Sequence, residues 1–194
     1  MSLKAGIIGM PNVGKSTLFN AITKKNILAA NYPFATIDPN LGTVTVPDVR
    51  LGVLENMYNP ERCIGVQYEF TDIAGLVKGA SNGEGLGNKF LSHIREVDAV
   101  VHVVRCFVDK DIIHVEGDVD PVRDIEIINL ELAMSDLEIV TNRLDRIKKK
   151  AETSKDKDAL KEVELLEKCK NILVSGDILR HHEFNEDELL ILKP

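Results

Sequence analysis

A glycine-rich loop near the N-terminus carries the residues best suited to hold phosphate groups. Residues 9–17 read Gly-Met-Pro-Asn-Val-Gly-Lys-Ser-Thr, which fits the pattern GxxxxGK[ST]. In such a loop, backbone N–H groups and the start of the next helix surround the phosphates, and the lysine reaches the β- and γ-phosphates. We therefore expect Lys15 to act in catalysis. The residues expected to contact a nucleotide are Pro11, Asn12, Val13, Gly14, Lys15, Ser16 and Thr17.

Three oxygen-bearing residues are candidates for a magnesium site beside this loop. Ser16 supplies the hydroxyl that such loops direct at Mg²⁺. Asp72 ends an apolar segment, where P-loop enzymes place a magnesium-associated carboxylate, although a strand-end aspartate can also simply cap a turn. Thr36 lies in a proline-marked loop and is expected to complete the magnesium shell when a γ-phosphate is present, which would make this loop a switch. An ordinary loop threonine is the alternative for Thr36.

The residues after Asp72 bear on how a γ-phosphate would be attacked. The backbone N–H of Gly75 is expected to meet the γ-phosphate, but the next residue is Leu76, where many related enzymes carry a glutamine that orients water. Leucine cannot polarise water, so another group must substitute or hydrolysis must be slow. His114 follows the apolar segment 99–104 on the side where active sites form in such sheets, and histidine is a residue type suited to act as a general base. A surface loop histidine is the alternative.

The elements that must position these residues alternate between strand and helix. Apolar or β-branched segments predict strands at residues 3–8, 43–46, 66–73 and 99–104. Helical spacing predicts helices at 15–25 and 88–96, so that the glycine-rich loop joins a strand to a helix as its pattern requires. The nearly all-apolar segment 99–104 is expected to be a central parallel strand. We therefore predict an α/β fold, a mostly parallel sheet flanked by helices.

The second half of the chain has a different periodicity. Apolar residues step by three and four at Leu130, Ala133, Leu137, Val140, Leu144 and Ile147, and a weaker series starts at Leu160, Val163 and Leu166. The polar residues 152–158 lie between the two series, which favours an inserted antiparallel helical (coiled-coil) hairpin over two helices packed flat on the sheet domain. The predicted domains are a nucleotide-binding domain at 1–122, the hairpin at 123–180 and a return segment at 181–194.

Composition restricts the location and the partners. The net charge of −7 and the sequence pI near 5.3 disfavour a generally basic, sequence-specific DNA-binding surface. The three cysteines are widely spaced and form no CxxC pair, which suits a reducing compartment. Because no apolar run approaches the roughly 20 residues of a membrane helix, we expect a cytoplasmic protein without membrane contacts.

Four segments together resemble the YchF group of the Obg-related, translation-factor-class GTPases, also called Obg-like ATPases. They are GMPNVGKST at 9–17, NYPFATIDPNLG at 31–42, DIAGLVKGASNGEGLGNKFL at 72–91 and VVRCF at 103–107. The resemblance runs from about residue 3 to residue 194. It implies a Ras-like P-loop NTPase domain, an inserted helical hairpin, a C-terminal ubiquitin-like domain, hydrolysis of ATP in preference to GTP, and association with ribosomes. It also points to His114.

The sequence departs from this family pattern at its end. The family's C-terminal domain is absent, as is the strand with the base-reading Asn-x-x-Glu, and the chain stops at Leu189–Pro194, about where that strand should begin. We therefore expect a piece of a longer protein whose own residues do not decide between ATP and GTP. Asn142–Asp145 resembles the usual base-reading motif but falls inside the helical series. Asn12 fits phosphate loops of relatives that place K⁺ beside the phosphates, which makes K⁺ a second candidate cofactor.

Three functions are compatible with these observations. The favoured one is a Mg²⁺-dependent ATPase or GTPase switch that acts with the ribosome. A P-loop kinase for a small acceptor is the second, disfavoured because no arginine cluster is present. In the third, the hairpin binds ribosomal RNA through lysines near its tip, although acidic residues interrupt this basic cluster: Lys148, Lys149, Lys150, Lys155, Lys157 and Lys161.

Overall fold

The computed structural model describes residues 3–24, 40–73, 86–154 and 156–193. The chain forms two compact units, Met1–Ile125 and Glu126–Pro194, and each is described by itself. The boundary between them falls inside one long helix. The predicted three-part division of the chain stays a prediction.

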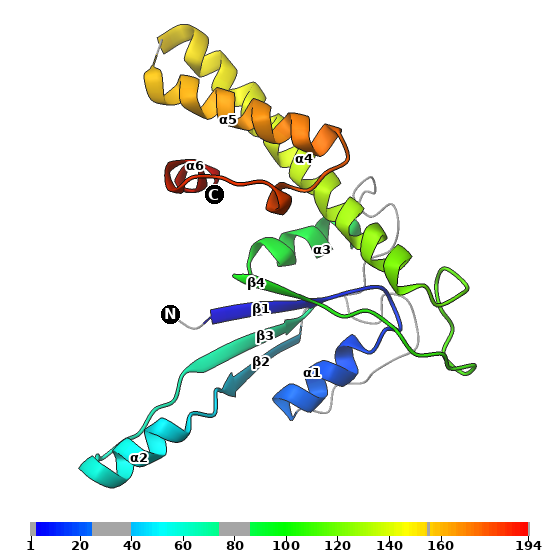
Figure 1. Cartoon of the computed structure of the whole chain (residues 1–194), viewed down its shortest axis with the longest axis vertical. Coiled ribbons are helices and arrows are strands. Elements are labelled where there is room, and N and C mark those ends of the chain that lie inside the picture. The colour runs from blue at the N-terminus through cyan, green and yellow to red at the C-terminus, as the bar shows by residue number, and fades with distance from the viewer. Residues whose placement is uncertain (1–2, 25–39, 74–85, 155, 194) are drawn as a thin grey trace. The chain divides into compact units, whose positions relative to one another are not determined.

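The first unit is built on a four-stranded sheet (Figure 1). The strands are β1 (Leu3–Ile8), β2 (Asn40–Thr45), β3 (Gln67–Asp72) and β4 (Ala99–His102), in the spatial order β2-β3-β1-β4. Strand β1 pairs in parallel with β3 and with β4, whereas β2 runs antiparallel to β3. All four predicted strands are therefore present, and the carboxyl ends of β1, β3 and β4 meet at one edge of the sheet.

Three helices accompany these strands. Helix α1 (Lys15–Thr23) and helix α3 (Leu86–Arg95) lie on opposite faces of the sheet (Figure 1), and both were predicted. The fully buried Phe19 anchors α1. Helix α2 (Val49–Tyr58) was not predicted; the Asp48 carboxylate accepts a hydrogen bond from the Arg50 N–H at its start. No side chain of α2 is buried, so no apolar periodicity marked it in the sequence.

The segment 99–104 is not a central strand in the described part of the chain. Strand β4 covers only Ala99–His102 and lies at one end of the four-stranded sheet. Val100 and Val101 are 42% and 37% exposed, although an apolar run usually indicates a strand covered on both faces. The run predicted the strand correctly and its position in the sheet wrongly.

The second unit contains a helical hairpin. Helix α4 (Pro121–Ser154) begins in the first unit and supplies one arm, and helix α5 (Lys157–Val174) supplies the other. Their packed core consists of Ala133, Val140, Leu144, Leu165, Leu166, Cys169 and Leu173. The predicted hairpin helices are therefore present. Asn142–Asp145 lies inside α4 with Leu144 2% exposed, as expected for a motif that does not read a base.

The predicted helix series needs two corrections. Leu130 is 54% exposed and Leu160 is 48% exposed, so neither belongs to the buried seam. On α5 the buried face begins at the neighbouring Ala159 and continues through Leu166 and Cys169. The spacing was read correctly but started one residue late, because the small Ala159 gave a weaker apolar signal than Leu160.

The last residues form a helix. Helix α6 (Glu186–Leu192) begins with a capping box between Asn185 and Glu188, and it follows a short 3₁₀ turn, η2 (Leu179–His181). Ile191 packs against the hairpin core, and the Ile191 carbonyl accepts a hydrogen bond from Arg143 of α4 at 2.7 Å. The capping box and the acidic first turn favour this helix, and the position of the base-reading strand stays a prediction.

Among the described residues, no helix has the length and apolar character needed to cross a membrane.

Candidate functional site

The loop at residues 9–17 joins β1 to α1, as its sequence pattern requires. Three of its residues have positive φ angles: Gly9 at +151°, Asn12 at +60° and Gly14 at +101°. Gly14 is also the N-cap of α1 in the left-handed conformation. Glycine adopts such angles at little cost, and asparagine tolerates them better than most residues. The loop therefore turns sharply enough for the N-terminus of α1 to face the carboxyl edge of the sheet.

Gly9 is required by space as well as by conformation. A Cβ atom at this position would lie 2.3 Å from the carbonyl oxygen of Val103, closer than any real contact allows. The approach arises because the Val103 N–H donates to the Ile8 carbonyl at 2.8 Å, which continues the pairing of β1 and β4 into the loop. The start of the phosphate loop is thus clamped against the backbone that follows β4.

Lys15 is buried in the loop. Its side chain is 8% exposed, and Nζ donates to the carbonyl oxygen of Met10 at 2.7 Å. Burial lowers the pKa of Lys15 to about 8, while the nearby Asp72 carboxylate acts in the opposite direction. Burial removes water from the ammonium group of Lys15. A phosphate oxygen can replace that water and compensate the positive charge, so the group is well suited to bind phosphate.

Ser16 and Asp72 meet at the edge of the sheet. Asp72 ends β3 opposite Ile7 of β1, and its Oδ2 accepts a hydrogen bond from Ser16 Oγ at 2.7 Å. The carboxylate is 2% exposed, and burial raises the pKa of Asp72, while the Ser16 hydrogen bond and the Lys15 charge act to lower it. A hydroxyl and a buried carboxylate in contact are the donor set that a small hard cation such as Mg²⁺ takes from a protein.

The other predicted site residues fall into two groups. Pro11 and Val13 are buried within the loop, so their side chains shape it, and Thr17 is exposed at the start of α1. Thr36 and Gly75, predicted to meet magnesium and the γ-phosphate, lie outside the described residues. The roles assigned to all these residues stay predictions.

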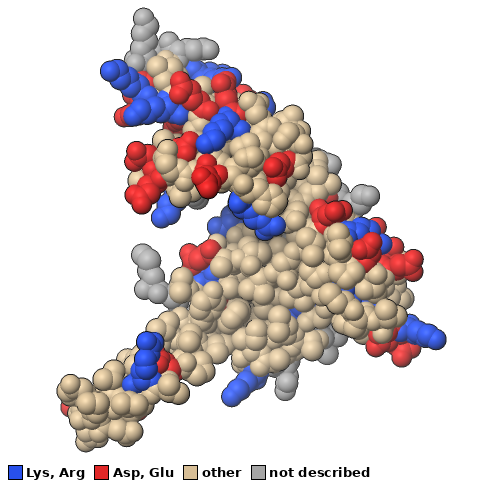
Figure 2. Space-filling view, in the orientation of Figure 1, with Lys and Arg blue, Asp and Glu red and all other residues tan. Residues whose placement is uncertain are grey.

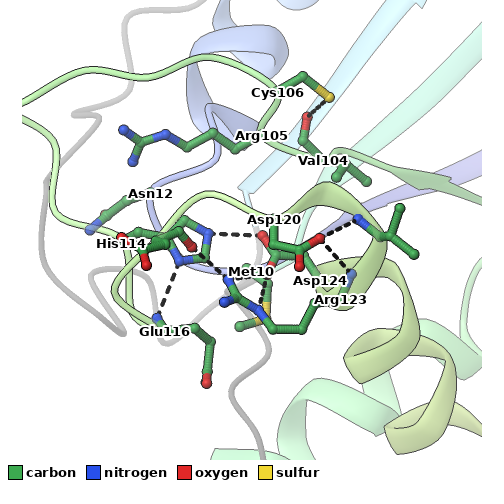
Figure 3. A network of polar contacts seen from close by, with 12 residues as sticks. Met10, Asn12, Val104, Arg105, Cys106, His114, Glu116, Asp120, Arg123 and Asp124 are labelled. Carbon is green, nitrogen blue, oxygen red and sulfur yellow. Dashed lines mark hydrogen bonds and ion pairs between the residues drawn. The ribbon is translucent and has the colours of Figure 1, made fainter.

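A second polar centre, shown in Figure 3, lies in the segment after β4. Arg105 is 1% exposed and donates to three backbone carbonyls: Phe107 at 3.1 Å, Ile112 at 3.0 Å and Asp109 at 3.2 Å. The guanidinium also lies 4.8 Å from the centre of the Phe107 ring. One buried side chain therefore holds an otherwise irregular segment in a fixed path.

His114 lies at the end of this segment and is buried, not a surface residue. Its Nε2 lies 2.8 Å from Oδ2 of Asp124, and both side chains are 2% exposed (Figure 3). The other ring nitrogen, Nδ1, accepts a hydrogen bond from the Glu116 N–H at 3.2 Å. Asn12 of the phosphate loop donates from Nδ2 to the Ile113 carbonyl at 3.1 Å. His114 is thus one residue from a direct contact with the phosphate loop.

Sequence reasoning missed Arg105 and Asp124. An arginine after an apolar strand carries no periodic signal, and its three carbonyl partners are set by the path of the loop. Asp124 stands in the first turn of α4, whose start is marked by the N-cap Asp120 and by Pro121. Those signals could have placed the start of the helix, but they could not have shown that Asp124 turns toward His114.

Comparison with known proteins connects this geometry to a family. Residues 4–174 match the family model described as 50S ribosome-binding GTPase. The ribosome-binding ATPase YchF of Bacillus subtilis (strain 168) is 58% identical over all of this chain and 52% of its own length, and that of Haemophilus ducreyi is 55% identical over all of this chain and 53% of its own.

A solved structure agrees with these matches. The structure of the Schizosaccharomyces pombe YchF GTPase superposes with a TM-score of 0.75 at 46% identity, covering 98% of this chain and 52% of that one. The chain spans about half the length of the relatives it matches. The fold, the phosphate-loop geometry and these matches agree: the chain belongs to the 50S ribosome-binding GTPase family, and its resemblance to the YchF group is confirmed.

Proposed function

We propose that this chain is the nucleotide-hydrolysing part of a ribosome-associated switch protein, and that it cleaves ATP to ADP and phosphate. The observation that carries the proposal is the contact between Ser16 and Asp72 beside the buried Lys15. These three groups come from the phosphate loop and from β3, two segments separated in the sequence by more than 50 residues. Their convergence at the N-terminus of α1 is what binding of a triphosphate with a divalent cation requires.

The residues have distinct roles in this proposal. The loop N–H groups from Pro11 to Thr17 bind the phosphates, and Lys15 compensates the charge on the β- and γ-phosphates. Ser16 and Asp72 would hold Mg²⁺, with Thr36 completing its shell, and the ion would offset charge on the phosphate oxygens. The Gly75 N–H binds the γ-phosphate. His114 accepts the proton of the attacking water, a role to which the missing glutamine at Leu76 and the position beside the phosphate loop both point.

The nucleotide itself is proposed from the relatives. The curated bacterial relatives are named ATPases, whereas the fission yeast structure is named a GTPase. We propose ATP because the two bacterial sequences are the more similar of the three. The ribosome is the proposed partner, since those relatives are named ribosome-binding, and a ribosomal partner implies a cytoplasmic location.

Phosphate release without any acceptor tests the proposal. The chain is incubated with ATP or GTP, with and without Mg²⁺, and phosphate and bound nucleotide are measured. We expect Mg²⁺-dependent release of phosphate. In Asp72→Asn, the Mg²⁺ concentration needed for half-maximal release should rise at least about tenfold. Glu69→Gln, on the same strand β3, is the matched control and should leave it unchanged. A folded chain that binds neither nucleotide would refute the proposal, and phosphate transfer only to an added acceptor would favour a kinase.

Potassium is a further part of the proposal. Asn12 is fixed at a positive φ angle and bonded to the Ile113 carbonyl, so it stands between the phosphate loop and the segment that carries His114. We expect hydrolysis to be faster in K⁺ than in Na⁺ at equal ionic strength. Equal rates in the two salts would remove K⁺ from the mechanism.

The hairpin lysines give weaker support to a separate RNA-binding function. Lys148 forms an ion pair with Glu167 at 2.7 Å, so part of its charge is compensated within the hairpin. In Figure 2, basic and acidic side chains are intermixed over the visible face of the hairpin. A mixed surface attracts phosphates less than a basic one does. We therefore do not place the main function there.

A further inference from the structure

The two hydrogen bonds of His114 determine which ring nitrogen carries the proton. The Glu116 N–H can only donate, so Nδ1 must accept and therefore carries no proton. In the neutral ring the proton then resides on Nε2, from which it is donated to Oδ2 of Asp124 at 2.8 Å. The free electron pair that could take a proton from water is thus the one on Nδ1.

The two hydrogen bonds differ in strength. The bond to Asp124 is short, joins the ring to a carboxylate, and connects two side chains that are each 2% exposed. The bond from Glu116 is 3.2 Å long and involves a neutral backbone group within the tight turn in which the Gly117 N–H donates to the His114 carbonyl. If this turn opens, the Glu116 bond breaks first and Nδ1 becomes free while Asp124 still holds Nε2.

Asp124 is itself held in place. Its second oxygen, Oδ1, accepts from Arg123 Nη2 at 3.0 Å and from Arg123 Nε at 3.3 Å. It stands in the first turn of α4, where the helix dipole favours a negative charge. Asp120 fixes that turn, because its Oδ1 accepts from the N–H groups of Val122 and Arg123. The carboxylate that faces His114 therefore has a fixed orientation, and Arg123 and the helix dipole stabilise its negative charge.

We propose that Asp124 is a positioning residue for nucleotide hydrolysis, acting through His114. It holds the imidazole with the proton on Nε2, so that Nδ1 accepts a proton from the attacking water. The water oxygen bonds to the γ-phosphorus, the bond from that phosphorus to the β–γ bridging oxygen breaks, and the nucleoside diphosphate leaves with the electron pair. The proton passes to Nδ1, and the Asp124 carboxylate stabilises the resulting imidazolium. This inference rests on the proposed function.

The first test is Asp124→Asn in the whole chain. Arg123 donates from Nε and Nη2 to Oδ1 of Asp124, so the amide oxygen of the new side chain is expected to face Arg123 and its NH₂ group to face His114. The ring must then accept at Nε2 and carry its proton on Nδ1, the tautomer that cannot take a proton from water. We expect kcat to fall roughly 100-fold or more while the dissociation constant for the nucleotide changes by less than about threefold. Glu126→Gln is the matched control, since it also removes a carboxylate from α4 but at an exposed position that has no part in the proposed mechanism.

A double-mutant comparison separates positioning from a purely structural role. If Asp124 acts through His114, the double variant His114→Ala/Asp124→Asn is no slower than His114→Ala alone. Independent, multiplicative losses of kcat would refute the inference. So would an unchanged kcat in Asp124→Asn while wild type hydrolyses ATP and His114→Ala is slow. Absence of hydrolysis in wild type would instead refute the proposed function.

A measurement on the unmodified chain guards against variants that fail to fold. The ¹⁵N signals of the His114 ring report which nitrogen carries the proton. We expect an acceptor-type signal for Nδ1 and a protonated signal for Nε2 in the nucleotide-free chain. A ring protonated on Nδ1 would overturn the inference, whatever the variants show.

Discussion

Two neighbouring segments of the first unit hold buried polar groups by different means. The phosphate loop, residues 9–17, is shaped by backbone conformation. Gly9 and Gly14 adopt positive φ angles, and the Lys15 side chain donates a hydrogen bond within the loop, to the Met10 carbonyl. The segment 105–124 is shaped by side chains, because Arg105 binds three carbonyls and Asp124 binds His114. The phosphate loop can therefore be recognised from its sequence. The segment 105–124 depends on side-chain contacts that correspond to no short sequence pattern.

The contrast also separates function from stability. In the phosphate loop, the buried Lys15 has a lowered pKa and donates a hydrogen bond to the Met10 carbonyl, and its ammonium group is available to a ligand. In the segment 105–124, the buried polar groups are satisfied by the protein itself. We expect substitutions in the loop to damage binding first and substitutions in the segment to damage stability first.

Lys15→Met gives the largest expected change in binding. Loss of a charged partner to phosphate should weaken nucleotide binding at least about 100-fold. Methionine is of similar length and removes a charge whose burial is costly, so the urea midpoint should stay the same or rise. Lys110→Met, at an exposed position, is the control and should change neither quantity. A variant that binds ATP normally would show that the loop does not hold phosphate through this side chain.

Arg105→Met gives the opposite pattern. Three carbonyls lose their buried donor, and we expect the free energy of unfolding to fall by about 3 kcal/mol or more. Urea denaturation measures the loss, and hydrogen exchange should show it concentrated in the segment. Arg50→Met removes an exposed ion pair with Asp48 and should leave the free energy of unfolding nearly unchanged. Equal losses in the two variants would contradict the role given to Arg105.

Replacing the two glycines of the loop sharpens the comparison. Gly9→Ala places a Cβ 2.3 Å from the Val103 carbonyl oxygen at a φ of +151°, so we expect a loss of stability of about 2 kcal/mol. A Cβ atom at position 14 would meet no atom within 4 Å. Gly14→Ala should therefore lose only about 1 kcal/mol of stability, through the strain of its positive φ angle. Thermal denaturation of both variants measures the difference. If Gly14→Ala were the more damaging variant, the close packing of Gly9 against the Val103 carbonyl would not be what limits this position.

The smallest effect is expected for Asn12→Gly, because Asn12 joins the two segments through one hydrogen bond. Asn12→Gly keeps the positive φ angle accessible and removes only the bond to the Ile113 carbonyl, so stability should fall by at most about 1 kcal/mol. Hydrogen exchange around residue 116 should become faster. Asn12→Ala should cost a further amount of about 1 kcal/mol, since alanine resists this conformation. Unchanged exchange in both variants would show that the two segments are independent.

The same contrast explains how far the sequence could be read. The phosphate-loop pattern specifies a backbone path, and the structure brings Ser16 of this loop into contact with Asp72 at the end of β3, while the roles of Lys15, Ser16 and Asp72 stay predictions. Helix α2 was missed because none of its side chains is buried, so its apolar residues do not mark one buried face. The pairing of His114 with Asp124 depends on how the segment after β4 folds back on the start of α4, which no spacing rule describes.

Helix α4 is long, and Asp124 stands at its beginning. Helix α4 has 34 residues, so at 1.5 Å per residue it is roughly 50 Å long. Its first turn contains Asp124, and its last turns belong to the hairpin. The carboxylate that holds His114 and the packed residues of the hairpin, Leu144 among them, therefore belong to one continuous ladder of backbone hydrogen bonds.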